Sequence, residues 1–135
     1  GGEVAYHQDS SFLYTKPEST VGFWIALEDA KVDNGCLWVA EGGHKGPLRE
    51  LFIRKRDKVM MKTLDDTKIE KKTIPLEVKE GALILLHGRL PHYSCENISS
   101  KSRHAFSIHI IDGNCEYSKE NWLQRKSMPL RGFID

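Results

Sequence analysis

The sequence predicts a mostly β fold of the jelly-roll type, in which short strands form two facing sheets. Short segments rich in β-branched, aromatic and other apolar residues dominate the chain. Turn-forming residues separate these segments at close intervals. No stretch of about ten or more residues shows the periodicity of an amphipathic helix. Strands of this length and spacing are typical of a double-sheet jelly roll.

Each expected strand lies between turn signals. Strands are expected at residues 3–9, 22–28, 36–40, 74–78, 82–87, 92–96 and 103–112. The intervening turns are expected at residues 16–19, 33–35, 42–43, 80–81 and 97–100. Because successive side chains of a strand point to opposite faces, each strand also predicts which of its residues share a face.

Three further segments lie between or after these strands. Pro47 can open a helical turn through residues 48–53, because its fixed φ suits a first helical position. Residues 54–72 form a variable insert with eight Lys or Arg against four Asp or Glu. This charge run favours a solvated excursion or a pair of short helices, with a lid over a site as the alternative. Residues 118–123 are typical of a capped turn that docks Trp122 on the core.

Composition sets the broad class of the protein. A chain of 135 residues with 39% hydrophobic residues is expected to form a single domain, residues 1–135, around one modest core. The formal net charge is +1, from 20 basic and 19 acidic residues. The overall charge therefore gives no support for binding to nucleic acid or to an anionic membrane.

The cysteines and the longest apolar run indicate an intracellular setting. Cys36, Cys95 and Cys115 have neither the even number nor the paired spacing of a disulfide framework or a zinc knuckle. The run at residues 82–86 is far shorter than the roughly 18 residues of a membrane span. We therefore expect a cytoplasmic protein without a membrane span. Because the chain starts at Gly1 without Met, we also expect a longer parent upstream.

The triplet His7-Gln8-Asp9 is the most informative motif, because it predicts one corner of a metal site. On a strand, His7 and Asp9 leave the same face while Gln8 leaves the other. Two imidazoles and one carboxylate can fill one triangular face of an octahedral metal, which leaves the opposite positions open. Non-haem Fe(II) oxygenases use this arrangement.

His92 is the predicted third ligand, and His87 is its rival. Only His92 is followed by Ser two residues on and by Arg eleven residues on, at Ser94 and Arg103. The side chains of His92 and Ser94 leave the same face of their strand, so Ser94 is placed to assist Arg103.

Arg103 begins an expected strand and predicts an anion site. Its face continues with Ala105, Ser107 and His109, and the two small side chains leave space beside the guanidinium. A planar guanidinium binds a carboxylate through two charge-assisted hydrogen bonds. The natural guest is the distal carboxylate of a dicarboxylate such as 2-oxoglutarate. We interpret His109 and His87 as core histidines whose hydrogen bonds are satisfied.

Trp24 shares a face with Gly22 and Ala26, which indicates a cavity wall with an aromatic plate. The alternative is that Trp24 is an ordinary core residue. His44, after Gly42-Gly43, is expected to be a turn residue.

Four stretches of the sequence resemble the phytanoyl-CoA dioxygenase (PhyH) family. These stretches are HQDSSFLYTKP, GFWIALEDAKVDNGCLWVAEGGHKGPLR, EGALILLHGRLPHYSCENISSKSRHAFSIHIIDG and YSKENWLQR. The resemblance covers nearly the whole chain except the 54–72 insert. It implies a double-stranded β-helix, a cupin-like jelly roll, of which this chain is the N-terminally truncated, C-terminal part of the family domain. Where the family usually has Pro-Gly-Ser-His, this chain has Glu-Gly-Gly-His at residues 41–44, which is expected to alter a turn near the entrance.

The resemblance also implies residue roles. The implied iron ligands are His7, Asp9 and His92. The implied partner of the 2-oxoglutarate C5 carboxylate is Arg103, and Trp24 and Ser94 match further positions that contact this cosubstrate.

The resulting function is that of an Fe(II)- and 2-oxoglutarate-dependent dioxygenase. Such an enzyme uses O2 to hydroxylate an unactivated C–H bond of a small-molecule substrate, with release of succinate and CO2. An acyl-CoA, a small metabolite and a peptide side chain fit the residues equally well as substrate. The alternatives are a non-catalytic metal- or ligand-binding jelly roll, or inactive fragment, and a metal-dependent isomerase or hydrolase. The last of these leaves Arg103 and Ser94 without a purpose.

Overall fold

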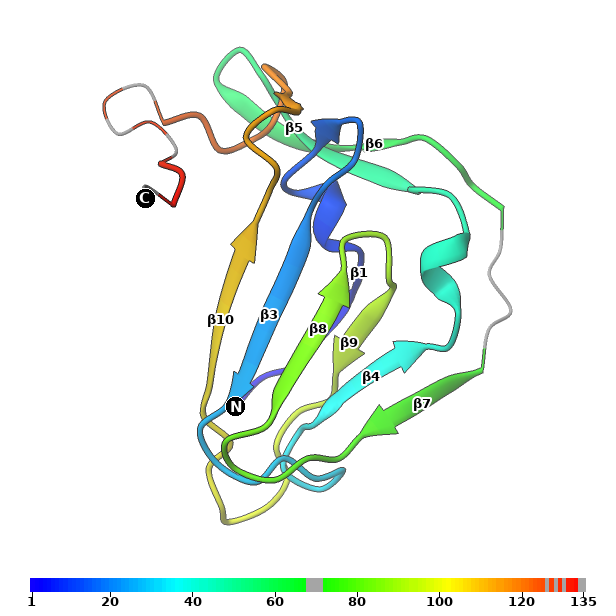
Figure 1. Ribbon diagram of the computed structural model, residues 1–135. Helices are drawn as coiled ribbons and strands as arrows, with labels where there is room; N and C mark the ends of the chain where they lie inside the picture. The colour runs from blue at the N-terminus through cyan, green and yellow to red at the C-terminus, as the bar shows by residue number, and fades with distance from the viewer. Residues whose placement is uncertain (68–71, 126, 128, 130, 134–135) are drawn as a thin grey trace.

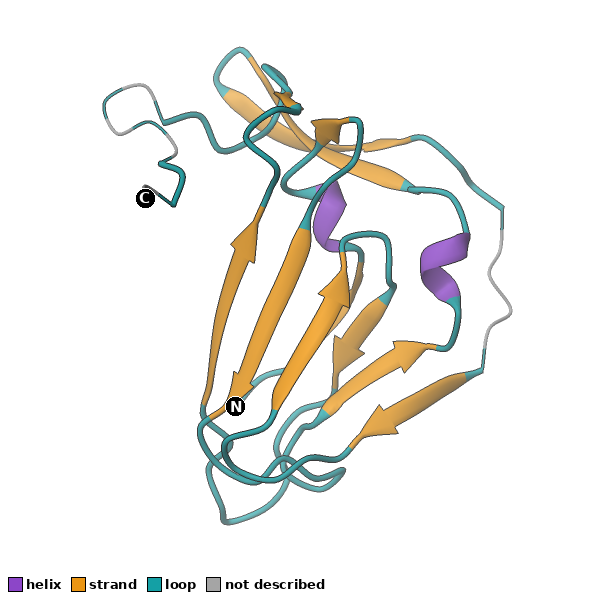
Figure 2. Ribbon diagram, in the orientation of Figure 1, coloured by secondary structure: helices purple, strands orange, loops and turns teal. Residues whose placement is uncertain are grey.

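Two antiparallel sheets pack against each other, with a hairpin and a short ribbon at one end (Figures 1 and 2). The computed structural model describes residues 1–67, 72–125, 127, 129 and 131–133. Its strands are β1 (Val4–His7), β2 (Thr15–Lys16), β3 (Val21–Ala26), β4 (Leu37–Ala40), β5 (Glu50–Lys55), β6 (Lys58–Thr63), β7 (Thr73–Leu76), β8 (Leu83–His87), β9 (His92–Ser94), β10 (Ala105–Ile110) and β11 (Glu116–Tyr117). The helical elements of the described residues are the 3₁₀ helices η1 (Asp9–Ser11) and η2 (Gly43–Lys45).

The first sheet has the strand order β1-β9-β4-β7, and every neighbouring pair is antiparallel. β9 is short and lies between β1 and β4. His92 pairs with His7 on one side and with Val39 on the other. Two segments from opposite parts of the chain are therefore neighbours in this sheet.

The second sheet has the order β10-β3-β8 and faces the first. In its register, Gly22 of β3 pairs with His109 of β10 and with Leu86 of β8. The sheet's outer face exposes Leu83, Leu85, Phe106 and Ile108.

The main core lies between the sheets. Trp24, Ala26 and Leu86 of the second sheet pack in one cluster with Leu37 and Val39 of β4. Each large apolar side chain buried in this way stabilises the fold by roughly 1.5–3 kcal/mol. The same packing holds the inner faces of the two sheets at a fixed separation.

The predicted mostly β jelly roll is confirmed. Every predicted strand has an observed counterpart, with each boundary within two residues of the predicted one. At two functional positions the difference matters. Asp9 follows β1 in η1 rather than lying on the strand, and Arg103 precedes β10 rather than starting it.

The prediction of a helical turn after Pro47 is wrong, as is that of short helices at the start of the charged insert. Residues 50–63 form the β5–β6 hairpin, and Leu51 and Ile53 are buried at alternate positions of β5. Residues 56–57 form its turn, in which Arg56 has a φ of 56°. The alternation of buried side chains along β5 is typical of a strand, and it predicts this segment better than Pro47 does. The side chains of β6 are exposed, as a solvated excursion predicts. Residues 68–71 of the insert lie outside the described residues.

The capped turn near residue 118 is confirmed, but it packs on the hairpin. The Asn121 N–H donates to the Ser118 carbonyl, and the Trp122 N–H donates to the Phe52 carbonyl. The rings of Trp122 and Phe52 have centroids 5.8 Å apart. Trp122 therefore covers β5 rather than the central core.

Gly88, between β8 and β9, has no room for a side chain. A Cβ atom there would lie 2.2 Å from Ser10 Oγ and 2.6 Å from the Thr20 carbonyl oxygen. We predict that Gly88→Ala lowers the free energy of unfolding by about 1–3 kcal/mol, because the backbone at Thr20 would have to shift to make room for the new methyl group. The measurement is urea unfolding followed by circular dichroism. Gly113→Ala is the control, since its surroundings are open, and its effect is expected within about 0.5 kcal/mol. Equal effects of the two variants would contradict the prediction.

Candidate metal centre

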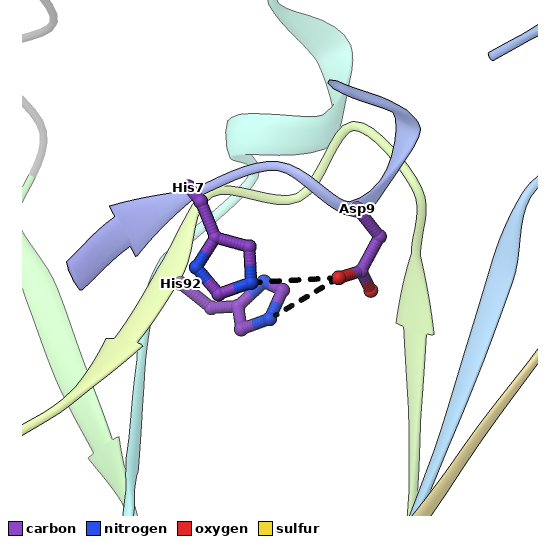
Figure 3. A group of neighbouring side chains, drawn as sticks. All are labelled: His7, Asp9 and His92. Carbon is purple, nitrogen blue, oxygen red and sulfur yellow. Dashed lines mark ion pairs between the residues drawn. The ribbon is translucent and has the colours of Figure 1, made fainter. Parts of the chain in front are cut away.

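His7, Asp9 and His92 converge at one end of the space between the sheets (Figure 3). One ligand atom from each lies within 4.8 Å of the other two. Asp9 Oδ1 is 3.5 Å from His7 Nε2 and 3.7 Å from His92 Nε2. The prediction that these residues lie together is therefore met, and His92 rather than His87 is the third member.

Backbone carbonyls orient both imidazoles. His7 Nδ1 lies 2.7 Å from the Ala5 oxygen, and His92 Nδ1 lies 2.9 Å from the Leu90 oxygen. A carbonyl accepts only, so each Nδ1 is the protonated nitrogen that donates. The remaining lone pair is then on Nε2, which faces Asp9. This is how metal-binding histidines are held in the correct tautomer.

A turn of 3₁₀ helix, not strand alternation, aims the Asp9 carboxylate. Gln8 lies between β1 and η1 and is anchored by its side-chain amide, which donates to the carbonyls of Pro47 and Arg89 at 3.1 and 2.8 Å. Its Oε1 accepts from the Arg49 N–H at 3.0 Å. The Ser10 N–H then donates to the Gly88 carbonyl at 2.9 Å. These bonds hold the chain on both sides of Asp9.

The centre is strongly polarised. Burial opposes ionisation of Asp9, but His109, His7 and His92 together outweigh burial and hold the pKa of its carboxyl well below the usual range. Burial lowers the pKa of His92 below its ordinary value. Burial also opposes protonation of His7, yet its contacts with Asp9 and the Ala5 carbonyl raise its pKa. A buried carboxylate facing imidazole nitrogens is a site where a divalent cation can replace a proton.

A cavity of about 160 Å³ adjoins the three residues. Its lining comes from both sheets and includes Trp24, Leu37, Leu86, Ser94, Arg103 and Ser107. Arg103 enters from the loop before β10, and its Cζ lies 5.7 Å from the centroid of the Trp24 ring. The Nε atom of Arg103 is buried and has no hydrogen-bond partner among the described residues.

The other predicted residues are also placed. Trp24 is both a core residue and a cavity wall, so the two interpretations hold together. Ser94 is buried and lines the cavity. His87 lies apart: its ring is exposed, its Nδ1 accepts from the Arg89 N–H, and it neighbours the ring of His44 at 5.5 Å. The interpretation of His87 as a core histidine is therefore wrong.

His109 is a second histidine that sequence reasoning assigned incorrectly. It lines the cavity rather than the core, and its Nε2 lies 3.2 Å from Asp9 Oδ2. The signal was present in the sequence, since His109 shares strand parity with Ser107. The anchoring role of Gln8 left no comparable pattern, because its partners come from two distant loops.

Comparison with known proteins gives the family context. Residues 1–105 match the family described as Phytanoyl-CoA dioxygenase (PhyH). Phytanoyl-CoA dioxygenase 1 of Oryza sativa subsp. japonica is 52% identical over 130 residues, which cover 96% of this chain and 46% of the rice protein. Phytanoyl-CoA dioxygenase domain-containing protein 1 of Bos taurus is 43% identical over 130 residues, covering 92% of this chain and 45% of the bovine protein.

The fold matches solved structures as well. The non-heme alpha ketoglutarate dependent carbocyclase SnoK from nogalamycin biosynthesis superimposes with a TM-score of 0.69 at 21% identity, over 98% of this chain and 55% of SnoK. This chain spans about half the length of the curated relatives it matches. None of the helices among the described residues is long and apolar enough to cross a membrane.

We predict that His92→Ala abolishes tight binding of a divalent cation, because it removes one of the three candidate ligands. His87→Ala is the matched control and is expected to bind as the unmodified protein does. Anaerobic titration with Co(II), followed by visible absorption, measures both. Loss of binding in the His87 variant with retention in the His92 variant would reverse the ligand assignment.

Proposed function

Because the chain belongs to the phytanoyl-CoA dioxygenase (PhyH) family, we propose that it carries the metal centre of an Fe(II)- and 2-oxoglutarate-dependent dioxygenase. In this proposal the protein uses O2 to hydroxylate an unactivated C–H bond of a small-molecule substrate, and succinate and CO2 are released. Residues 1–135 form the C-terminal part of the domain, and His7, Asp9 and His92 hold the iron.

The observation that carries the proposal is the position of Arg103. Its guanidinium enters the cavity that also holds the three ligand residues, and its buried Nε has no partner among the described residues. Leaving such a buried donor unpaired costs about 1–3 kcal/mol, and more when it is charged. A ligand with a carboxylate removes this cost. A metal-dependent hydrolase or isomerase would leave the Arg103 guanidinium without a role.

The donor set suits iron. Two imidazoles and one carboxylate are the facial triad of non-haem Fe(II) oxygenases, and they leave positions free for other ligands. Gly22 opposite Asp9 keeps a cradle open, because a Cβ there would lie 2.8 Å from Asp9 Oδ2. Bound iron with 2-oxoglutarate would supply the oxidising chemistry, which the side chains themselves cannot provide.

The chain's own residues bind and orient the cosubstrate. Arg103 binds the distal carboxylate through its planar guanidinium, and the ring of Trp24 keeps that guanidinium in place by a cation–π contact. Ser94, two residues after His92, offers a hydroxyl to the same carboxylate. Leu37 and Leu86 give the same cavity an apolar wall.

We predict that Arg103→Met weakens 2-oxoglutarate binding by at least roughly 30-fold, as expected when a charge-assisted pair worth about 2 kcal/mol or more is lost. Calorimetry with the Mn(II)-loaded protein under anaerobic conditions measures this change. Pyruvate is the matched ligand, since it has the 2-oxo acid group without the distal carboxylate, and its affinity should not change. A similar loss for both ligands would show that Arg103 does not bind the distal carboxylate.

Turnover gives the direct test. With Fe(II), O2 and 2-oxoglutarate, the protein should form succinate, and Asp9→Ala should lower the rate to background because the metal loses its anionic ligand. Lys119→Ala, on the exposed C-terminal segment, is the control and should retain the rate. A protein that binds 2-oxoglutarate but forms no succinate would instead be a non-catalytic binding protein.

A further inference from the structure

The two oxygens of the Asp9 carboxylate face different partners. Oδ1 lies 3.5 and 3.7 Å from the Nε2 atoms of His7 and His92. Oδ2 points the other way, and His109 Nε2 lies 3.2 Å from it. The nitrogen lies within hydrogen-bonding distance of Oδ2, although the contact is not aligned as a full hydrogen bond among the described residues. Oδ1 of Asp9 therefore faces the two candidate ligand histidines, whereas Oδ2 faces His109.

His109 reaches Asp9 across a gap left by a glycine. His109 on β10 pairs with Gly22 on β3, and a Cβ on Gly22 would lie 2.8 Å from Asp9 Oδ2. The same Cβ would lie 3.4 Å from the His109 ring. Real Cβ atoms almost never approach an oxygen to 2.8 Å, so any larger residue would displace the carboxylate. Gly22 thus supplies the room that the contact needs.

His109 is not a fourth ligand. Among the described residues, the group whose ligand atoms all lie within 4.8 Å of one another comprises His7, Asp9 and His92 and does not include His109. The ring of His109 is half-buried at the wall of the cavity, on the second sheet, whereas His7 and His92 lie on the first. It acts on the centre through Asp9.

We propose that His109 is a positioning residue that holds Asp9 Oδ2, so that Asp9 offers a single oxygen to the metal, and that Gly22 makes this contact possible. The proposal rests on the metal centre of the proposed function. A carboxylate free to rotate can bind a metal through both oxygens and occupy a position that another ligand needs. Partners of this kind orient metal ligands and commonly change metal affinity by about 10–100-fold.

The test compares His109→Leu, which removes the N–H donor, with His109→Gln, which keeps one. Anaerobic Co(II) titration of the purified protein should show about 10–100-fold weaker binding for His109→Leu and recovery of most of the affinity for His109→Gln. His104→Leu is the matched control, because it removes a surface contact between a histidine and Glu28, and it should bind as the unmodified protein does.

Infrared difference spectra on addition of Co(II) report how the carboxylate binds. The separation between the antisymmetric and symmetric carboxylate stretches should be wide in the unmodified protein and in His109→Gln, and narrow in His109→Leu. If His109→Leu does not fold, Gly22→Ala tests the same contact with His109 in place and should also weaken Co(II) binding. Where both fold, the double variant should lose less than the product of the two single losses.

The outcomes separate the two proposals. Equal Co(II) affinity and equal carboxylate spectra for the unmodified protein and the folded His109→Leu or Gly22→Ala variant would overturn the role of His109 alone. Absence of Co(II) binding by the unmodified protein would overturn the metal centre and the role of His109 together.

Discussion

The antiparallel pairing of β1 with β9 is the constraint on which the candidate site depends. It sets His7 beside His92, and each imidazole is then turned by a carbonyl of its own segment. Asp9 can complete the group only because the chain leaves β1 in a tight 3₁₀ turn at this point. If β1 shifted by one residue, His7 would move to the opposite face of the sheet. Gln8 resists such a shift through its three hydrogen bonds to distant loops.

The second sheet contributes the electrostatics of the site. It carries Trp24 and His109, and Arg103 enters beside it from the preceding loop. The loop is held by Glu28, whose carboxylate accepts from the His104 N–H at 2.7 Å and from the Ser102 hydroxyl at 2.7 Å. The cavity therefore has the Arg103 guanidinium and the Asp9 carboxylate at separate places. This separation suits a ligand that has an anionic group at one end and a different polar group at the other.

Strand parity predicted much of this site from the sequence. The alternation in residues 103–110 placed Arg103, Ser107 and His109 on one face, and the Ser and Arg after His92 distinguished it from His87. Parity does not predict where a strand ends, so the 3₁₀ turn at Asp9 and the loop position of Arg103 were missed. The β5–β6 hairpin was hidden because exposed charges obscured the alternation of Leu51 and Ile53. Parity places His109 on the face that lines the cavity, but its contact with Asp9 also depends on how the two sheets pack, which parity alone does not predict.

The pairing of β1 with β9 also bears on how a cation would bind at the candidate site. The two strands come from opposite parts of the chain, and contacts of such high sequence separation slow folding, because the loop must close before they form. The unfolded chain accordingly holds the three ligands far apart. A cation that binds only the assembled triad stabilises the folded state, and this stabilisation rises with the logarithm of the cation concentration once that concentration exceeds Kd. If the triad binds a cation, its removal is expected to favour release of β1, the strand at the edge of its sheet.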